Sequence, residues 1–276
     1  MPEVRIVFSD LDDTFVARDK SVPAENLRVL DTLYDRGIPF VPCTGRGFAA
    51  IPTIVRGHPA SRYFVTSSGA VVNDAWGRII WSRAIGPERT LALYEMLRDL
   101  DISFDVFADG RIFAERSRFS HIPNFGIAPE HLALLLKSRT VVDLTVEQIV
   151  ERAEVVERVG IFWSDGEEGE RDAAVVKAAI DAIPGLRWTT SYRLGVEVVD
   201  SQASKGEALS WLCERLGIPR ACSVAFGDSP NDTEMMLAAG TGVAMENAYP
   251  ELVAVADDTC PSCDDAGVAR WLASHL

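Results

Sequence analysis

The sequence lacks a long apolar run and any excess of basic residues. No stretch approaches the roughly 18 consecutive apolar residues that span a bilayer, and neither end shows a basic region followed by an apolar segment. The 41 acidic residues outnumber the 27 basic ones, giving a net charge of −14, which repels nucleic acid unless a local basic patch intervenes. We therefore expect a soluble cytoplasmic protein without a membrane or nucleic-acid partner. An anionic substrate must then be attracted by local groups, such as a metal ion, a lysine or a helix N-terminus.

Cysteine and histidine are also scarce. The five cysteines are odd in number and scattered, so they form no disulfide framework. Cys260 and Cys263 enclose a C-P-S-C tetrad, but no second pair or nearby histidine completes a zinc site. We interpret them as two unpaired thiols in a loop. The histidines show no clustering that would indicate a metal site: His58, His121, His131 and His275.

Alternating strand and helix signals at both ends of the chain predict one α/β domain. Ser204 followed by Glu207 forms a capping box, and Gly217 stands where a C-cap glycine belongs. The fold expected is a Rossmann-like, doubly wound parallel sheet. Strands are expected at 4–9, 40–43, 63–66, 223–226 and 242–245, and helices at 23–36, 204–216, 231–239 and 264–274.

The middle of the chain has a different pattern, which we interpret as an inserted α+β cap domain. Strands at 103–107 and 111–115 flank Asp109-Gly110, a hairpin signal that is foreign to a doubly wound sheet. The core is therefore predicted at 1–83 plus 196–276 and the cap at 84–195. Further cap elements are expected as helices near 130–137 and 171–182, strands near 155–163 and 188–199, and a solvated charged turn at 165–172.

The segment Asp10-Leu11-Asp12-Asp13-Thr14 directly follows the first predicted strand. In an open parallel sheet, ligands bind beyond the carboxyl ends of the strands, where this loop would lie. One carboxylate can attack phosphorus and another can shuttle the proton, provided that positive charge offsets an anionic substrate. Asp10 and Asp12 can divide these roles. Taken alone, the spacing favours a simpler interpretation, in which acidic residues cap the next helix.

Three further segments place polar residues at strand ends or helix starts. Thr44 ends the second strand in Thr44-Gly45-Arg46, where its hydroxyl and adjoining N–H groups can hold a phosphoryl oxygen or simply cap a helix. Lys205 opens a helix, where its charge is mildly unfavourable unless an anion binds there or solvent screens it. The segment from Gly227-Asp228 to Asn231-Asp232 follows another strand and supplies hard carboxylate oxygens that select Mg²⁺. Each fits an ordinary loop, but together they indicate phosphoryl transfer.

These motifs resemble those of the haloacid dehalogenase superfamily, and within it the Cof-type phosphatases, which carry a large C2B-type cap. Asp10 to Thr14 matches D-x-D-x-T, and Thr44 matches the second motif. Lys205 in Ser204-Lys205-Gly206 matches the third motif, and Gly227-Asp228 through Asn231-Asp232 matches the fourth. Further similar text lies at Ser68-Gly69-Ala70, at 244–248 and at 264–268. The subgroup usually has Asn where Ser68 stands.

The resemblance implies a Mg²⁺-dependent phosphomonoester hydrolase that acts on a small phosphorylated metabolite, such as a sugar phosphate. Asp10 would be the nucleophile and Asp12 the general acid and base. The metal ligands would be Asp10, the main-chain carbonyl of Asp12, Asp228 and Asp232, the last directly or through another ligand. The phosphoryl group would be bound by Thr44, Gly45, Arg46, Lys205 and Asn231.

Substrate choice is expected to reside in the cap, where Arg118, His121 and Asn124 are candidates to line the cleft. Two alternatives stay open, a phosphomutase with the same aspartate chemistry and a catalytically silent metabolite-binding protein. A dehalogenase is disfavoured by Asp12 and Asp228, and an ion pump by the missing membrane helices. The sequence identifies neither the substrate nor the choice between monomer and homodimer.

Overall fold

The computed structural model describes residues 3–276, apart from the side chain of Ser191, and the chain forms two compact units. The core unit ends its first part at Trp81 and resumes with Ala203–Leu276, while Ser82–Gln202 forms the inserted unit. The second boundary thus lies between 202 and 203, not between 195 and 196 as predicted. The reason is that Gly195–Asp200 is a strand of the inserted unit's own sheet. No helix in this described part of the chain is long and apolar enough to cross a membrane.

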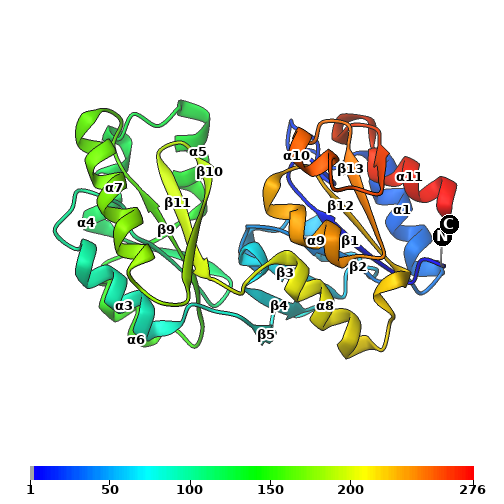
Figure 1. Cartoon of the computed structure of the whole chain (residues 1–276), viewed down its shortest axis with the longest axis horizontal. Helices are drawn as coiled ribbons and strands as arrows, with labels where there is room; N and C mark the ends of the chain where they lie inside the picture. Colours follow the sequence, from blue (N-terminus) through cyan, green and yellow to red (C-terminus); the bar gives the residue numbers. More distant parts are fainter. Residues whose placement is uncertain (1–2) are drawn as a thin grey trace. The chain divides into compact units, whose positions relative to one another are not determined.

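The core unit is built on an eight-stranded sheet in the order β14-β13-β12-β1-β2-β3-β4-β5 (Figure 1). The pairs from β14 to β3 are parallel, and β4 runs antiparallel to β3. A parallel core with antiparallel strands at one edge is common in large mixed sheets. The strands are β1 Ile6–Asp10, β2 Phe40–Cys43, β3 Tyr63–Thr66, β4 Val71–Asp74, β5 Ile79–Ser82, β12 Ser223–Gly227, β13 Thr241–Met245 and β14 Asp258–Cys260.

The two faces of the core sheet are covered by different helices. Alternation along β1 sends Val7 to one hydrophobic cluster and Ile6 and Phe8 to another. The first cluster includes Leu30 of α1 and Leu272 of α11; the second includes residues of α8 and α9. Each such buried side chain contributes about 1.5–3 kcal/mol. The four helices are α1 Ala24–Asp35, α8 Lys205–Leu216, α9 Thr233–Ala238 and α11 Gly267–His275.

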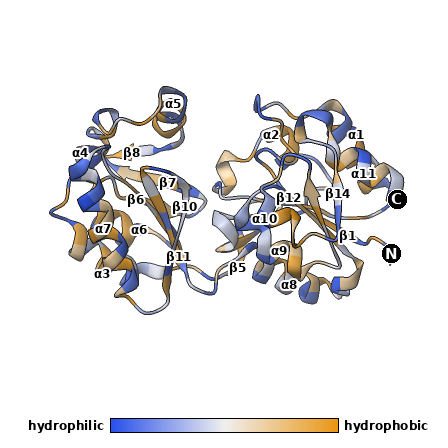
Figure 2. Ribbon diagram, turned by 45° about the horizontal axis from the view of Figure 1, so that its top comes forward, coloured by the Kyte–Doolittle hydropathy of each residue, from blue (hydrophilic) through white to orange (hydrophobic). Residues whose placement is uncertain are grey.

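These helices are amphipathic, and Figure 2 shows hydrophobic and hydrophilic segments side by side on α1, α8 and α11. The predicted caps of α8 are confirmed in part: the Ser204 hydroxyl accepts a hydrogen bond from the Glu207 N–H, and Gly217 adopts a left-handed φ of 65°. Short helical segments complete the core unit: η1 Phe48–Ala50, α2 Thr53–Arg56, η2 Ser67–Gly69, η4 Arg220–Cys222, η5 Pro230–Asp232, α10 Pro250–Val253 and η6 Cys263–Asp265.

The inserted unit has its own six-stranded sheet, in the order β10-β11-β9-β6-β7-β8. Asp109 and Gly110 join β6 to β7 with φ angles of 50° and 75°, as the two-residue hairpin signal predicts. The strands are β6 Asp105–Ala108, β7 Arg111–Glu115, β8 Thr140–Val142, β9 Val156–Phe162, β10 Leu186–Tyr192 and β11 Gly195–Asp200. The helical segments are α3 Gly86–Leu97, α4 Arg116–Phe119, η3 Ile122–Asn124, α5 Pro129–Ser138, α6 Val146–Arg152 and α7 Glu167–Asp181.

Two local predictions need correction. The charged stretch 165–172 is not a solvated turn throughout, because α7 already begins at Glu167. Glu167, Glu168 and Glu170 occupy the first turn of that helix, where the helix dipole favours negative charge. Cys260 and Cys263 are free thiols as predicted, but both are buried in the core, Cys260 at the end of β14 and Cys263 at the start of η6.

Candidate active site

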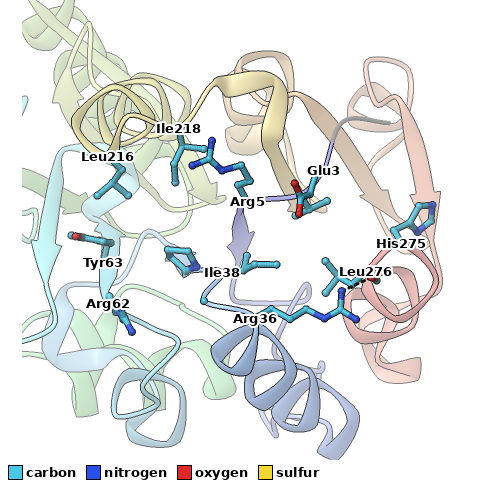
Figure 3. A pocket seen from close by; sticks show the side chains of 13 residues that line it. Glu3, Arg5, Arg36, Ile38, Arg62, Tyr63, Leu216, Ile218, His275 and Leu276 are labelled. Carbon is cyan, nitrogen blue, oxygen red and sulfur yellow. Dashed lines mark hydrogen bonds between the residues drawn. The ribbon is translucent and has the colours of Figure 1, made fainter.

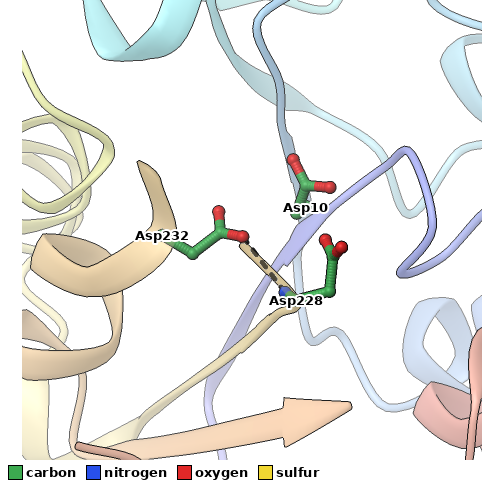
Figure 4. Close-up of side chains that lie close together, drawn as sticks. All are labelled: Asp10, Asp228 and Asp232. Carbon is green, nitrogen blue, oxygen red and sulfur yellow. Dashed lines mark hydrogen bonds between the residues drawn. The ribbon is translucent and has the colours of Figure 1, made fainter. Parts of the chain in front are cut away.

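Three carboxylates meet at the carboxyl ends of β1 and β12. Asp10 is the last residue of β1, Asp228 directly follows β12, and Asp232 ends η5. Because β1 and β12 are parallel neighbours, their carboxyl ends lie at the same edge of the sheet. Figure 4 shows the three side chains gathered there, and one ligand oxygen from each lies within 4.8 Å of the others. All three residues are buried.

A buried ammonium group joins two of these carboxylates. Nζ of Lys205 donates to Asp10 at 2.5 Å and to Asp232 at 2.6 Å. Burial alone would lower the pKa of Lys205, but the two carboxylates outweigh it and raise that pKa well above its ordinary value. Lys205 therefore stays positively charged at neutral pH.

Close backbone packing fixes the position of Lys205 at the start of α8. Its neighbour Gly206 faces α9, and a Cβ at Gly206 would lie 2.2 Å from the carbonyl oxygen of Glu234. On the other side, a Cβ at Gly69 would lie 2.2 Å from the carbonyl carbon of Ser204. Only glycine allows these two approaches, so the lysine is held between η2, which follows β3, and α9.

The cluster carries more negative than positive charge when its groups are ionised. Burial raises the pKa of Asp10 well above its usual value, and the nearby Asp232 and Asp228 add to this effect against the opposing charge of Lys205. Burial and the Asp232 carboxylate raise the pKa of Asp228 to about 7, although the Thr14 hydroxyl donates to it at 3.0 Å. A divalent cation would offset the surplus charge, and carboxylate oxygens are hard ligands. The donor set therefore fits a divalent metal ion.

The family assignment rests on nearly the whole chain. A family model described as haloacid dehalogenase-like hydrolase matches residues 7–272. The chain belongs to this family. The Cof-type resemblance and the expected hydrolase class are thereby confirmed, as is the α/β fold class.

Curated relatives of this haloacid dehalogenase-like hydrolase match it over almost their full length. It is 26% identical to Phosphatase YwpJ of Bacillus subtilis, over 99% of this chain and 100% of that protein. It is 25% identical to the 5-amino-6-(5-phospho-D-ribitylamino)uracil phosphatase YwtE of the same organism, over 98% of this chain and 97% of that protein. A solved structure from Eubacterium rectale superposes with a TM-score of 0.81 at 25% identity and covers 99% of both chains.

The second aspartate of the hydrolase motif, Asp12, is contacted by two cations other than Lys205. Arg46 donates to it from Nε at 2.8 Å and from Nη2 at 2.6 Å, and Nζ of Lys20 lies 3.4 Å away. Burial would raise the pKa of Asp12, but these two cations hold it below its usual value. Asp12 is therefore ionised at neutral pH in this arrangement.

The remaining predicted residues are distributed around these groups. Thr44 is buried; its hydroxyl accepts from the N–H of Arg46 at 3.1 Å and its N–H donates to Val65 at 2.8 Å. Gly45 lies between Thr44 and Arg46 in the same loop. Asn231 is exposed on η5 and accepts from the Ser229 hydroxyl at 2.8 Å. The predicted site residues thus come from the loops that follow β1, β2 and β12 and from the start of α8.

The segment with Ser68, where the hydrolase subgroup usually has Asn, is conformationally strained. Ser67, Ser68 and Gly69 have successive φ angles of 51°, 59° and 91°, all in the left-handed region. Only glycine adopts this region freely, and asparagine tolerates it better than serine. The N–H of Ser68 donates to the Thr44 carbonyl at 3.0 Å, so the strained turn supports the Thr44 loop.

Sequence reasoning missed three residues that organise the site. Lys20 contacts Asp12 and Asp13, and no local pattern indicates this contact. The Asn247 amide donates to the Asp13 carbonyl at 2.8 Å and its oxygen accepts from the Cys263 N–H at 2.9 Å. Thr14 was recognised only as part of a motif, without its bond to Asp228. The resemblance of residues 244–248 to the family was the one signal that pointed to Asn247.

The cap residues predicted to meet substrate have structural contacts within the inserted unit. Arg118 donates to the Leu100 and Ile102 carbonyls at 3.3 Å and to the carbonyl of Arg98. His121 is exposed and pairs with Asp101 at 2.5 Å. Substrate contact by Arg118, His121 and Asn124 stays a prediction.

Proposed function

We propose that this hydrolase is a Mg²⁺-dependent phosphatase that cleaves a small phosphorylated metabolite through an aspartyl phosphate on Asp10. The observation that carries the proposal is the Lys205 ammonium group, which bridges Asp10 and Asp232 beside Asp228. A buried nucleophile next to a fixed cation can approach an anionic phosphoryl group without prohibitive repulsion. The relatives named as phosphatases of a ribitylamino-uracil phosphate support a small phosphorylated substrate.

Mg²⁺ would be held by the carboxylates of Asp10 and Asp228 and the main-chain carbonyl of Asp12, with Asp232 close by. When bound, it would neutralise charge on the transferring phosphoryl group. Asp232 also accepts the N–H groups of Asp228 at 3.1 Å and Ser229 at 3.2 Å, which orients the metal-binding loop.

The chemical steps use the two motif aspartates in sequence. A carboxylate oxygen of Asp10 attacks phosphorus, the bond to the leaving oxygen breaks, and Asp12 gives that oxygen a proton. Asp12 then takes a proton from a water molecule that attacks the phosphorus of the acyl phosphate, which releases phosphate and restores Asp10. Lys205, Thr44 and the N–H groups around Gly45 stabilise the phosphoryl oxygens, and Asn231, exposed on η5 after β12, also binds them.

The pairing of Asp12 with Arg46 adds a condition to this mechanism. A carboxylate held in an arginine fork is a weak base and carries no proton at neutral pH, because its pKa is depressed, so it has none to give to the leaving oxygen. Asp12 must therefore leave Arg46 and take up a proton from solvent before it protonates the leaving oxygen. A substrate phosphoryl group offers Arg46 another anionic partner and so favours that release.

The test is phosphate release from p-nitrophenyl phosphate by wild type and Asp10→Asn, each with Mg²⁺ and with chelator. Only wild type with Mg²⁺ should be active, and Asp13→Asn, which changes a carboxylate in the same loop, should stay within about three-fold of wild type. Turnover by Asp10→Asn equal to wild type would contradict the mechanism. Activity that requires a bisphosphate activator would indicate a phosphomutase instead.

All five cysteines are free thiols, which fits a reducing compartment. We accordingly propose the cytoplasm as the place of action.

A further inference from the structure

A cavity lies in the core unit, at the opposite end of the parallel strands from the aspartates. It has a volume of about 680 Å³ and is lined by residues before β1 and β3, by the α1–β2 connection and by the last residues of α8 and α11. These segments meet at the amino ends of the parallel strands, whereas Asp10 lies at the carboxyl end of β1. Cavities of about 300–1,000 Å³ are of the size that holds small-molecule ligands. The residues that line this one (Figure 3) have no part in the proposed reaction.

The cavity concentrates positive charge in a chain of net charge −14. Arg5, Arg36 and Arg62 come from three separate segments, and Glu3 is the one acidic side chain among the lining residues. In a chain with 41 acidic residues, a cluster of arginines at the surface would readily find carboxylate partners if folding alone had placed it there.

Two of these guanidinium groups are available to a ligand. Arg36 donates to the main-chain oxygen of Leu276, so its guanidinium group already has a partner within the protein. Arg62 has only a long hydrogen bond of 3.4 Å from Nε to the Pro59 carbonyl. Among residues 3–276, the Arg5 guanidinium makes no hydrogen bond or ion pair, and Figure 3 shows it reaching toward Ile218. One planar guanidinium group can donate two parallel hydrogen bonds to the oxygens of a phosphate.

Apolar side chains accompany the arginines. Leu216 and Ile218 are half-buried where α8 turns toward β12, Ile38 is buried before β2, and the ring of Tyr63 is half-buried at the start of β3. A bare inorganic anion would gain nothing from these groups. An organic ligand with a flat apolar part would bury them while its charged group meets Arg5 or Arg62.

We propose that this cavity, defined by Arg5, Arg62, Tyr63, Leu216 and Ile218, is a second binding site for an organic phosphate of nucleotide size. It is separate from the catalytic carboxylates and does not depend on their metal. The two sites have opposite charge requirements: the metal-free cluster of Asp10, Asp228 and Asp232 repels anions, whereas the arginine cavity attracts them.

This difference allows the second site to be measured alone. We would measure the binding of AMP, inorganic phosphate and adenosine by isothermal titration calorimetry. The buffer contains chelator and little salt, so that the catalytic site has neither metal nor turnover. Three proteins are compared: wild type, Arg5→Ala/Arg62→Ala, and the matched control Arg215→Ala/Arg270→Ala. The control removes two exposed arginines of the same unit that do not line the cavity. Thermal unfolding of each protein checks that the variants are folded.

We expect wild type and the control variant to bind one AMP with a dissociation constant below about 1 mM, and the cavity variant to bind it at least ten-fold more weakly. Adenosine and inorganic phosphate should each bind more weakly than AMP. The proposal is overturned if wild type binds no AMP, if the cavity variant binds it as well as wild type, or if inorganic phosphate binds as tightly as AMP. If wild type shows no Mg²⁺-dependent turnover, the proposed phosphatase activity is refuted, but the AMP binding measured in chelator still tests the second site.

Discussion

The guanidinium group of Arg46 donates to both carboxylate oxygens of Asp12, from Nε at 2.8 Å and from Nη2 at 2.6 Å. Paired hydrogen bonds of this kind use the planar fork that arginine has and lysine lacks. The same fork is proposed to bind a phosphoryl group, so it has two alternative acceptors. Exchange between them would couple the arrival of substrate to the release of Asp12.

Arg46→Lys keeps the positive charge but removes the fork. We expect kcat/KM toward an aryl phosphate to fall by about ten-fold, because one charge-assisted hydrogen bond contributes about 1.5 kcal/mol. Arg56→Lys is the matched control, since Arg56 donates only to the Phe48 and Ala49 carbonyls. Steady-state kinetics of both variants with Mg²⁺ measure the effect. An unchanged kcat/KM for Arg46→Lys would show that the fork does not serve the reaction.

Asp228→Asn should stabilise the metal-free protein at alkaline pH. The pKa of Asp228 is raised to about 7 in the folded protein, above the ordinary value of 3.8 that applies to the unfolded chain. A raised carboxyl pKa contributes stability below pH 4 that is lost as pH rises through 7. In chelator, wild type should therefore lose stability between pH 4 and pH 7, and Asp228→Asn should lose less.

Urea unfolding of both proteins in chelator at pH 5 and pH 8 tests this expectation. At pH 8 the variant should be more stable by a few kcal/mol, of the order that a shift of this size implies. Added Mg²⁺ should stabilise wild type and leave the variant nearly unchanged, because the variant lacks one of the proposed carboxylate ligands and a weakly bound ligand adds little stability to the folded state. A variant that is less stable than wild type at pH 8 would contradict the raised pKa of Asp228 in the folded protein.

Gly206→Ala should move Lys205 without changing any charged group. The added Cβ would lie 2.2 Å from the Glu234 carbonyl oxygen, so α8 and α9 must separate. Overpacking of this kind costs about 1–3 kcal/mol. We expect that loss in urea unfolding, together with reduced kcat, because the ammonium group leaves its place between Asp10 and Asp232. Ser210→Ala in the same helix is the control and should change neither quantity appreciably. Full stability in Gly206→Ala would mean that the helices tolerate the separation.

The parts of the fold that were predicted are those with a strong local pattern. The strands at 40–43 and 63–66 begin and end where the sequence indicated. β14 escaped prediction because Asp258-Thr259-Cys260 has no apolar alternation and becomes a strand only by pairing with β13. The start of α7 was missed because acidic residues in a helical first turn have the composition of a loop.

The candidate site was likewise predicted only where the sequence has a local pattern. Asp10, Asp228 and Asp232 were predicted together, since parallel strands bring their carboxyl ends to one edge of the sheet. Lys205 was predicted from its place at the start of a helix and its match to the third motif. The bond from Thr14 to Asp228 joins residues 214 positions apart, and nothing near either residue in the sequence indicates it. The contacts of Lys20 and Asn247 likewise depend on the loops' tertiary arrangement.

Arg118→Ala should affect the inserted unit's stability more than its substrate choice. The Arg118 guanidinium donates to the carbonyls of Arg98, Leu100 and Ile102, which follow α3, and lies over the ring of Tyr94. Truncation leaves these carbonyls without their charged donor, so we expect a loss of about 1–3 kcal/mol in urea unfolding.

Arg116→Ala in the same short helix is the matched control for Arg118→Ala. Arg116 pairs only with the exposed Asp143, an ion pair whose removal should cost less than about 1 kcal/mol. The order in which wild type and Arg118→Ala prefer a panel of phosphorylated metabolites should be the same, because the guanidinium is already committed to three carbonyls. A changed order in Arg118→Ala, with stability equal to that of the Arg116→Ala control, would instead assign Arg118 to substrate recognition.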